Sequence, residues 1–113
     1  MIKLSIRRVK PEEEGALRQW MGELNRRQNE VRATFAREGV RHEQAWLVTT
    51  SDGPLLIYAM EESEQERAEQ TFKESTFAID EQHKNVMSQV LGGKVTAELL
   101  YECLAAGGVP RLR

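Results

Sequence analysis

The chain has 113 residues, the length of one domain, and this leaves no room for a second independent hydrophobic core. Its 16 basic and 18 acidic residues give a net charge of −2, which does not favour general binding to nucleic acids or anionic membranes. The single cysteine, Cys103, cannot form an intrachain disulfide and fits a reducing compartment. We therefore expect one cytoplasmic domain over residues 1–106 with a loose tail over residues 107–113, and neither nucleic acid nor membrane as a partner.

Residues 2–9 alternate between apolar and polar side chains, a pattern that predicts a half-buried strand. The apolar side chains share one face: Ile2, Leu4 and Ile6. The polar side chains share the other face: Lys3, Ser5 and Arg7. This alternation also lacks the uninterrupted apolar stretch of a signal peptide or membrane span.

A long amphipathic helix is predicted between Pro11 and Gly39. Its apolar residues recur at helical spacing: Leu17, Trp20, Met21, Leu24, Val31 and Phe35. Gly39 is the expected left-handed terminator, and Gly22 is a weak point inside the helix. The helix would be roughly 40 Å long, so one end is expected to overhang the sheet or bend. The polar residues 25–28 interrupt the apolar stripe, and they either border a pocket or form a solvated bend.

A hairpin is predicted over residues 40–60. Residues 40–50 read as one strand, residues 51–54 (Ser-Asp-Gly-Pro) as the turn, and residues 55–60 as the next strand. The second of these strands is apolar throughout, so protein should cover both of its faces.

Two shorter helices and a final segment follow the hairpin. Ser63 and Glu66 have the spacing of a capping box that opens the first of these helices. The next helix, which starts near Ile79 and ends at Gly92-Gly93, carries His83 on its apolar stripe. Periodicity does not decide whether residues 95–104 form a helix or a strand.

This order of elements predicts an α+β domain of the ferredoxin-like βαββαβ class, provided the final segment supplies the fourth strand. Such a domain has a four-stranded antiparallel sheet with its helices on one face. The other face would be bare, although the strand at residues 55–60 and Trp46 beside it are apolar. A second copy related by a two-fold axis is the expected cover, which gives a homodimer built as a dimeric α/β barrel.

Several segments resemble a bacterial family of about this length that has no assigned function and whose members look like dimeric α/β barrels. The resemblance rests on residues 23–27, 38–40, 56–60, 75–76, 79–80, 83 and 98–101. It implies that the final segment is a strand, supports the dimer, and implies no reaction. The chain has Phe77-Ala78 where the resemblance leads us to expect His-Pro.

Three residues are candidates for acid–base chemistry: His83, Tyr58 and Asp80. A histidine titrates near neutrality, but a histidine on an apolar stripe is also commonly a hydrogen-bonded core residue. Asp80 lies three residues before His83, so it could orient the imidazole or could act as a helix-start residue. Cys103 lies in an apolar context and is expected to be buried.

Candidate ligand-binding residues come from the polar break, the hairpin and the first strand: Asn25, Arg26, Trp46, Lys3 and Arg7. If Lys3 or Arg7 is buried, it needs an anionic partner, either from Glu43, Glu98 or Glu102, or from a bound anion. No metal site and no cofactor are expected.

The sequence leaves the function open between two classes. One is a small-molecule-binding domain or cofactor-independent enzyme, with its pocket between helices and sheet or inside the barrel. The other is a non-catalytic dimerisation module without a ligand. A cavity of roughly 300 Å³ or more with convergent polar groups would favour the first.

Overall fold

The computed structural model of the chain describes residues 1–62 and 65–105. Along the chain its elements are the strand β1 (Ile2–Val9), a 3-10 turn (Pro11–Glu13), the helices α1 (Glu14–Arg26) and α2 (Gln28–Glu38), the strands β2 (Val40–Thr50) and β3 (Gly53–Glu62), the helices α3 (Gln65–Glu74) and α4 (Ala78–Val90), and the strand β4 (Leu91–Val95). The predicted capping box at Ser63 and the predicted tail over residues 107–113 lie outside the described residues. None of the described helices combines the length and apolar character needed to cross a membrane.

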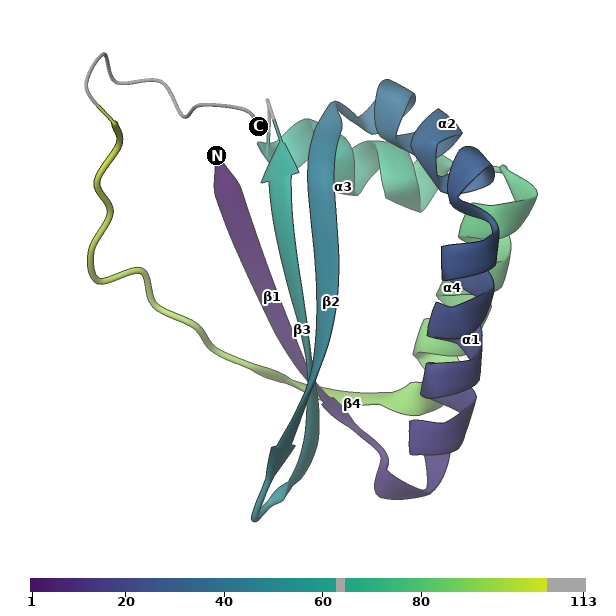
Figure 1. Ribbon diagram of the computed structural model, residues 1–113, viewed down its shortest axis with the longest axis vertical. Coiled ribbons are helices and arrows are strands. Elements are labelled where there is room, and N and C mark those ends of the chain that lie inside the picture. The colour runs from purple at the N-terminus through teal and green to yellow at the C-terminus, as the bar shows by residue number, and fades with distance from the viewer. Residues whose placement is uncertain (63–64, 106–113) are drawn as a thin grey trace.

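The four strands form one antiparallel sheet in the order β2-β3-β1-β4. All four α-helices lie on the same side of this sheet (Figure 1), with α1 packed beside α4 and α2 beside α3. The α+β class and the antiparallel four-stranded sheet predicted from the sequence are therefore confirmed.

The predicted long helix is two helices that meet at Arg27. The chain breaks in the polar stretch and not at Gly22, because Arg27 leaves helical geometry with φ −113° and ψ 37°. The Arg27 guanidinium bonds both carboxylate oxygens of Glu30, at 2.7 and 2.9 Å, and the side-chain oxygen of Gln82 in α4 at 2.7 Å. The break is thus fastened to the neighbouring helix.

Two predicted turns are confirmed. Gly39 ends α2 in the left-handed conformation with φ 73°, and its N–H donates to the carbonyl of Phe35 at 2.9 Å. In the hairpin between β2 and β3, Gly53 has φ 111°, a conformation that L side chains rarely adopt. The Thr50 hydroxyl donates to the Gly53 carbonyl at 2.7 Å and closes the turn.

The fourth strand lies earlier in the chain than predicted. Residues 91–95 form β4 and pair with β1, whereas residues 96–105 have no regular secondary structure. The expectation of a strand over residues 95–104 was therefore wrong. Gly92 and Gly93, expected to terminate α4, lie inside β4, because the chain becomes extended already at Leu91.

The face of the sheet that meets the helices carries the hydrophobic core. Val9, Leu17, Leu56 and Val90 are buried there in one cluster. Register also places Lys3 beside Met60 and Ser5 beside Tyr58 on this helix side. The polar face of β1 therefore points toward the helices and not toward a partner's sheet.

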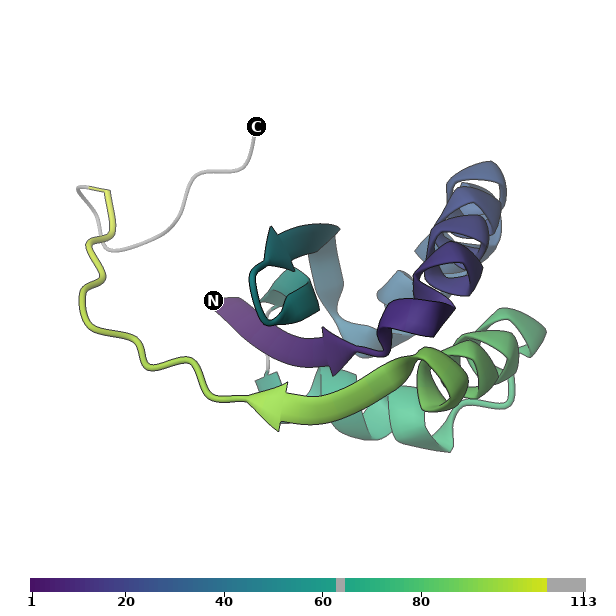
Figure 2. The same cartoon turned by 90° about the horizontal axis from the view of Figure 1, so that it is seen from below.

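The opposite face of the sheet, which we call the bare face, is apolar. Strand pairing groups these side chains on it: Ile2, Leu4 and Ile6 of β1, Leu55, Ile57 and Ala59 of β3, and Trp46 and Val48 of β2. Residues 96–105, which we call the arm, run out on the side of the sheet away from the helices and stand off the sheet (Figures 1 and 2). Cys103 lies exposed in the arm, contrary to the expectation that it is buried.

Candidate functional site

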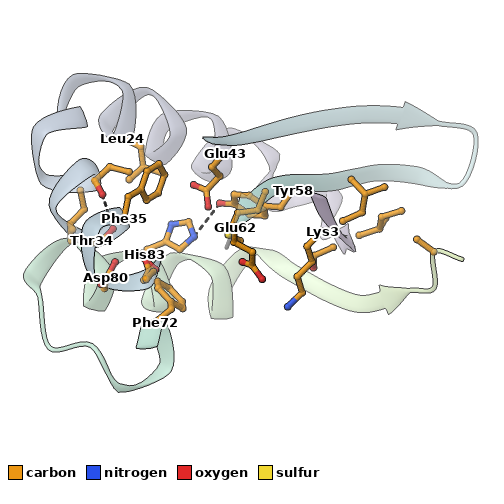
Figure 3. A pocket seen from close by; sticks show the side chains of 18 of the residues that line it. Lys3, Leu24, Thr34, Phe35, Glu43, Tyr58, Glu62, Phe72, Asp80 and His83 are labelled. Carbon is orange, nitrogen blue, oxygen red and sulfur yellow. Dashed lines mark hydrogen bonds between the residues drawn. The ribbon is translucent and has the colours of Figure 1, made fainter. Parts of the chain in front are cut away.

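A cavity of about 470 Å³ lies between the helix side of the sheet and the helices (Figure 3). Its walls are largely apolar and include Leu24, Phe35, Met60, Phe72 and Ile79. Polar groups converge on it from several elements: Glu38 of α2, Glu43 of β2, Tyr58 and Glu62 of β3, and Asp80 and His83 of α4. An apolar cavity of this size with a few converging polar groups is typical of a small-molecule site.

His83 is held by hydrogen bonds on both ring nitrogens. The indole N–H of Trp20 lies 2.7 Å from Nδ1, and the hydroxyl oxygen of Tyr58 lies 3.1 Å from Nε2. An indole N–H can only donate, so Nδ1 is the acceptor and the proton of the neutral ring sits on Nε2. Burial lowers the pKa of His83 to about 4, so the ring is neutral at physiological pH.

The hydroxyl of Tyr58 is oriented within the cavity by its hydrogen bond with His83. Because Nε2–H of His83 donates to the phenol oxygen, the hydroxyl hydrogen of Tyr58 remains available as a donor. Burial, together with the negative charge of Glu43, raises the pKa of Tyr58 well above its ordinary value. Tyr58 is therefore a protonated hydrogen-bond donor at neutral pH, and His83 positions it.

Glu38 and Glu43 are the titrating groups of the cavity. Burial, and after it the charges of Asp80 and Glu43, raise the pKa of Glu38 to about 7. Burial and the charge of Asp80 raise the pKa of Glu43 to about 7 as well. Each carboxyl group is thus divided between its protonated and ionised forms near neutrality, the condition that suits a general acid or base.

Asp80 is buried at 6% exposure in the first turn of α4. The N-cap residue of that helix is Phe77, so Asp80 is not the cap. It does not orient the imidazole either, because Trp20 and Tyr58 occupy both ring nitrogens of His83. Its contribution to the cavity is negative charge next to Glu38 and Glu43.

The basic residues predicted on β1 have different environments. Lys3 lines the cavity together with Lys94 of β4. The Arg7 guanidinium instead donates two hydrogen bonds, at 2.6 and 3.1 Å, to the Gly92 carbonyl and so fastens β1 to β4.

The polar break between α1 and α2 borders a second hollow of about 740 Å³, which extends to β2. Asn25, Gln28 and Trp46 line it, and it shares Tyr58 and Glu43 with the first cavity. Arg26 is bound to Glu23 at the surface, with its Nη2 2.8 Å from the carboxylate. The sequence suggested Asn25 and Arg26 as ligand-binding residues. Asn25 lines the second hollow, whereas Arg26 lines neither the hollow nor the first cavity.

Sequence reasoning did not assign Glu38 and Glu62 to a site and named Glu43 only as a possible partner of Lys3 or Arg7, although each of the three carried a signal. Glu38 stands at the C-terminal end of α2, where the helix dipole disfavours a negative charge. Glu43 shares the inward parity of Leu47 in β2, and Glu62 shares that of Tyr58 in β3. A carboxylate at an inward position of a strand is a cue for a polar pocket.

The carboxylates do not form a metal centre. Within the described part of the chain, no group of three or more histidine, cysteine, aspartate or glutamate side chains is arranged to hold a metal ion.

In a comparison with protein families, residues 1–107 match a family of unknown function, DUF6176. This confirms the predicted resemblance to a family without an assigned function, whereas the bacterial origin and the dimeric barrel stay predictions. No curated protein and no solved structure matches the chain.

Proposed function

The chain belongs to this family of unknown function, and from the geometry of its cavity we propose that it binds a small molecule between helices and sheet. The observation that carries the proposal is the fixed donor at Tyr58, aligned by His83 and Trp20, in an apolar cavity of about 470 Å³. Three hydrogen-bonded side chains in a row hold the phenol in one orientation before any ligand arrives, which lowers the entropic cost of binding.

The charges around the cavity indicate the kind of head group. Glu38, Glu43 and Asp80 gather at one part of the wall, and their mutual repulsion is relieved by a cation or a hydrogen-bond donor. We propose a ligand with an apolar body and a head group that is cationic or donates hydrogen bonds. This differs from the anionic ligand that the basic residues of β1 predict.

The same groups suit proton transfer. Glu43 is the proposed base or acid because its pKa is about 7 and because Tyr58, close beside it (Figure 3), can stabilise developing negative charge on a ligand oxygen. Such a reaction uses only side chains of this chain, in agreement with a cofactor-independent enzyme.

Three compounds with one apolar body and different head groups test the binding proposal: phenethylamine, phenethyl alcohol and phenylacetate. We expect the melting temperature to rise with the amine, less with the alcohol and least with the acid. A ligand at 100 times its dissociation constant adds about 2.7 kcal/mol to the free energy of unfolding. Glu43→Gln should reduce the rise with the amine, and Tyr58→Phe the rise with the alcohol.

Glu12→Gln is the matched control, because Glu12 is exposed in the 3-10 turn and lines neither cavity. It should leave every shift unchanged. Equal shifts in wild type and both cavity variants, or the largest shift with phenylacetate, would contradict the proposed site.

A second candidate role is self-association through the sheet, favoured by the bare face. Ile2, Leu4 and Trp46 on it are all more than half exposed. The helix and strand order, with β1 and β3 central and β2 and β4 at the edges, supports a ferredoxin-like assignment. We propose that two copies pack bare face to bare face as a dimeric α/β barrel. Light scattering coupled to gel filtration tests this, with a mass twice the 12.9 kDa of one chain expected.

We also propose that the protein works in the cytoplasm. An exposed free thiol at Cys103 stays reduced most readily in a reducing compartment, which supports this location. Fluorescence microscopy of a tagged chain in cells is the direct check.

A further inference from the structure

The arm presents apolar side chains to solvent. Leu99, Leu100 and Tyr101 are 75%, 84% and 81% exposed, and Leu104 is 46% exposed. The arm has no regular secondary structure over residues 96–105 and stands off its own sheet (Figure 2). A run of apolar side chains that does not pack against its own fold is typical of a segment with a binding partner.

The bare face offers an apolar surface that such an arm fits. An extended segment rises about 3.3 Å per residue, so the ten residues of the arm reach about 33 Å. The eight residues of β1 span about 26 Å on the same basis. One arm is therefore long enough to run the length of the bare face.

The charges on the bare face favour a second copy of the same chain as the partner. Arg8, paired with Leu55, lies at one end of the face, and Glu61, paired with Ile2, lies at the other end. A two-fold axis across the strands brings Arg8 of one copy over Glu61 of the other. A symmetric dimer thus sets opposite charges against each other at both ends of the contact.

We propose that the chain forms a dimer by reciprocal arm exchange, in which residues 96–105 of each copy run lengthwise along the bare face of the other, beside the contact between the two sheets. This inference rests on the self-association proposed above and adds the segment that carries it. The arm starts at the end of β4, and Lys94, Val95 and Ala97 line the cavity. Exchange of the arms therefore fixes the position of one wall of the ligand site.

Cys103, the single cysteine, allows a direct test in the full-length chain. It lies in the arm and is exposed, so a benzophenone maleimide attached to it places a photo-crosslinker where the arm binds. On irradiation we expect a covalent dimer on a denaturing gel. Peptide mapping should locate the crosslink on β1, β2 or β3 of the other copy. Mixing isotope-labelled with unlabelled protein distinguishes a crosslink between two copies from one within a single chain.

A full-length variant with Leu99→Glu and Leu100→Glu tests the energetics. Both side chains are more than 70% exposed in the single chain, so their replacement should leave the fold and the circular dichroism unchanged. We expect the variant to elute as a monomer and to bind more of the dye anilinonaphthalene sulfonate, since the bare face is uncovered. Glu98→Gln with Glu102→Gln is the matched control in the same arm and should stay dimeric.

The outcomes separate this inference from the self-association proposal. A dimer that persists in the Leu99→Glu, Leu100→Glu variant, together with a crosslink within one chain, overturns arm exchange and leaves the sheet dimer standing. A monomeric wild-type chain with a crosslink onto its own bare face overturns both. Loss of the dimer in the arm variant with a crosslink between copies in wild type supports arm exchange.

Discussion

The indole N–H of Trp20 lies 2.7 Å from Nδ1 of His83, and this contact decides which nitrogen of the imidazole carries the proton. Because Nδ1 must accept, Nε2 bears the hydrogen and faces the hydroxyl of Tyr58. A tryptophan that reads as an ordinary core residue thereby sets the direction of hydrogen bonding at the proposed ligand site.

Trp20→Phe should remove the hydrogen bond that decides which imidazole nitrogen of His83 carries the proton. The variant leaves Nδ1 of His83 without its donor, at a cost of about 1–3 kcal/mol in the free energy of unfolding. We expect the nitrogen chemical shifts of the imidazole to change from a single Nε2–H tautomer toward a mixture. Trp46→Phe is the matched control, because Trp46 is 57% exposed and its N–H bonds only Gln44 nearby. An unchanged tautomer in Trp20→Phe would contradict the role assigned to Trp20.

His83 should make the fold sensitive to acid. Its pKa is lowered from 6.5 to about 4 in the folded chain, so the unfolded chain binds an extra proton between these values. The contribution of neutral His83 to stability is therefore fully present above pH 6.5 and is lost as the pH falls toward 4, by on the order of 3 kcal/mol.

The stability gap between wild type and His83→Gln isolates this effect. Measured by denaturant unfolding, the gap should be constant above pH 6.5 and should shrink as the pH falls to 4. His42→Gln, on the exposed side of β2, controls for the introduced amide. A gap that is the same at every pH would show that His83 is not buried as described.

Glu43→Gln should stabilise the protein at alkaline pH. The folded pKa of Glu43 is about 7, above the ordinary 4.5, so ionisation of this carboxyl group destabilises the fold as the pH rises through 7. The neutral amide avoids that cost. Because Glu43 is partly exposed, the effect is discounted. We expect the free energy of unfolding of the variant to exceed that of wild type by about 1–2 kcal/mol at pH 8 and to equal it below pH 4.5.

Denaturant unfolding at the two pH values measures the gain, and Glu12→Gln, at an exposed carboxylate of the 3-10 turn, provides the control. A loss of stability at pH 8 in Glu43→Gln would mean that the ionised carboxylate has a compensating partner, and would remove the argument for a cationic ligand.

Arg27→Gln should weaken the junction between α1, α2 and α4. The Arg27 side chain is 21% exposed and bonds both Glu30 and Gln82, so its loss should lower the free energy of unfolding by more than the loss of a single exposed ion pair. Arg26→Gln is the control next to it: its pair with Glu23 is exposed and should be worth only a few tenths of a kcal/mol. Equal costs in the two variants would argue against a structural role for the break.

The site was only partly visible in the sequence. The helical spacing from Ile79 to Val90 correctly placed His83 on the inward side of its helix, because periodicity alone sets that direction. Its partners Trp20 and Tyr58 are 63 and 25 residues away, and no local pattern links them. The acidic wall likewise combines α2, β2 and α4, and only the packing of those elements brings Glu38, Glu43 and Asp80 together.

The sequence by itself determined the α+β class, the β2–β3 hairpin and the end of α2 at Gly39, because these depend on turn residues and local periodicity. Tertiary structure decided where β4 lies and which face of β1 meets the helices. Alternation separates Lys3, Ser5 and Arg7 from Ile2, Leu4 and Ile6, but it is symmetric between the two sides of a sheet. The pairing of Ser5 with Tyr58, whose hydroxyl meets His83, turned the polar side inward and left the apolar side bare.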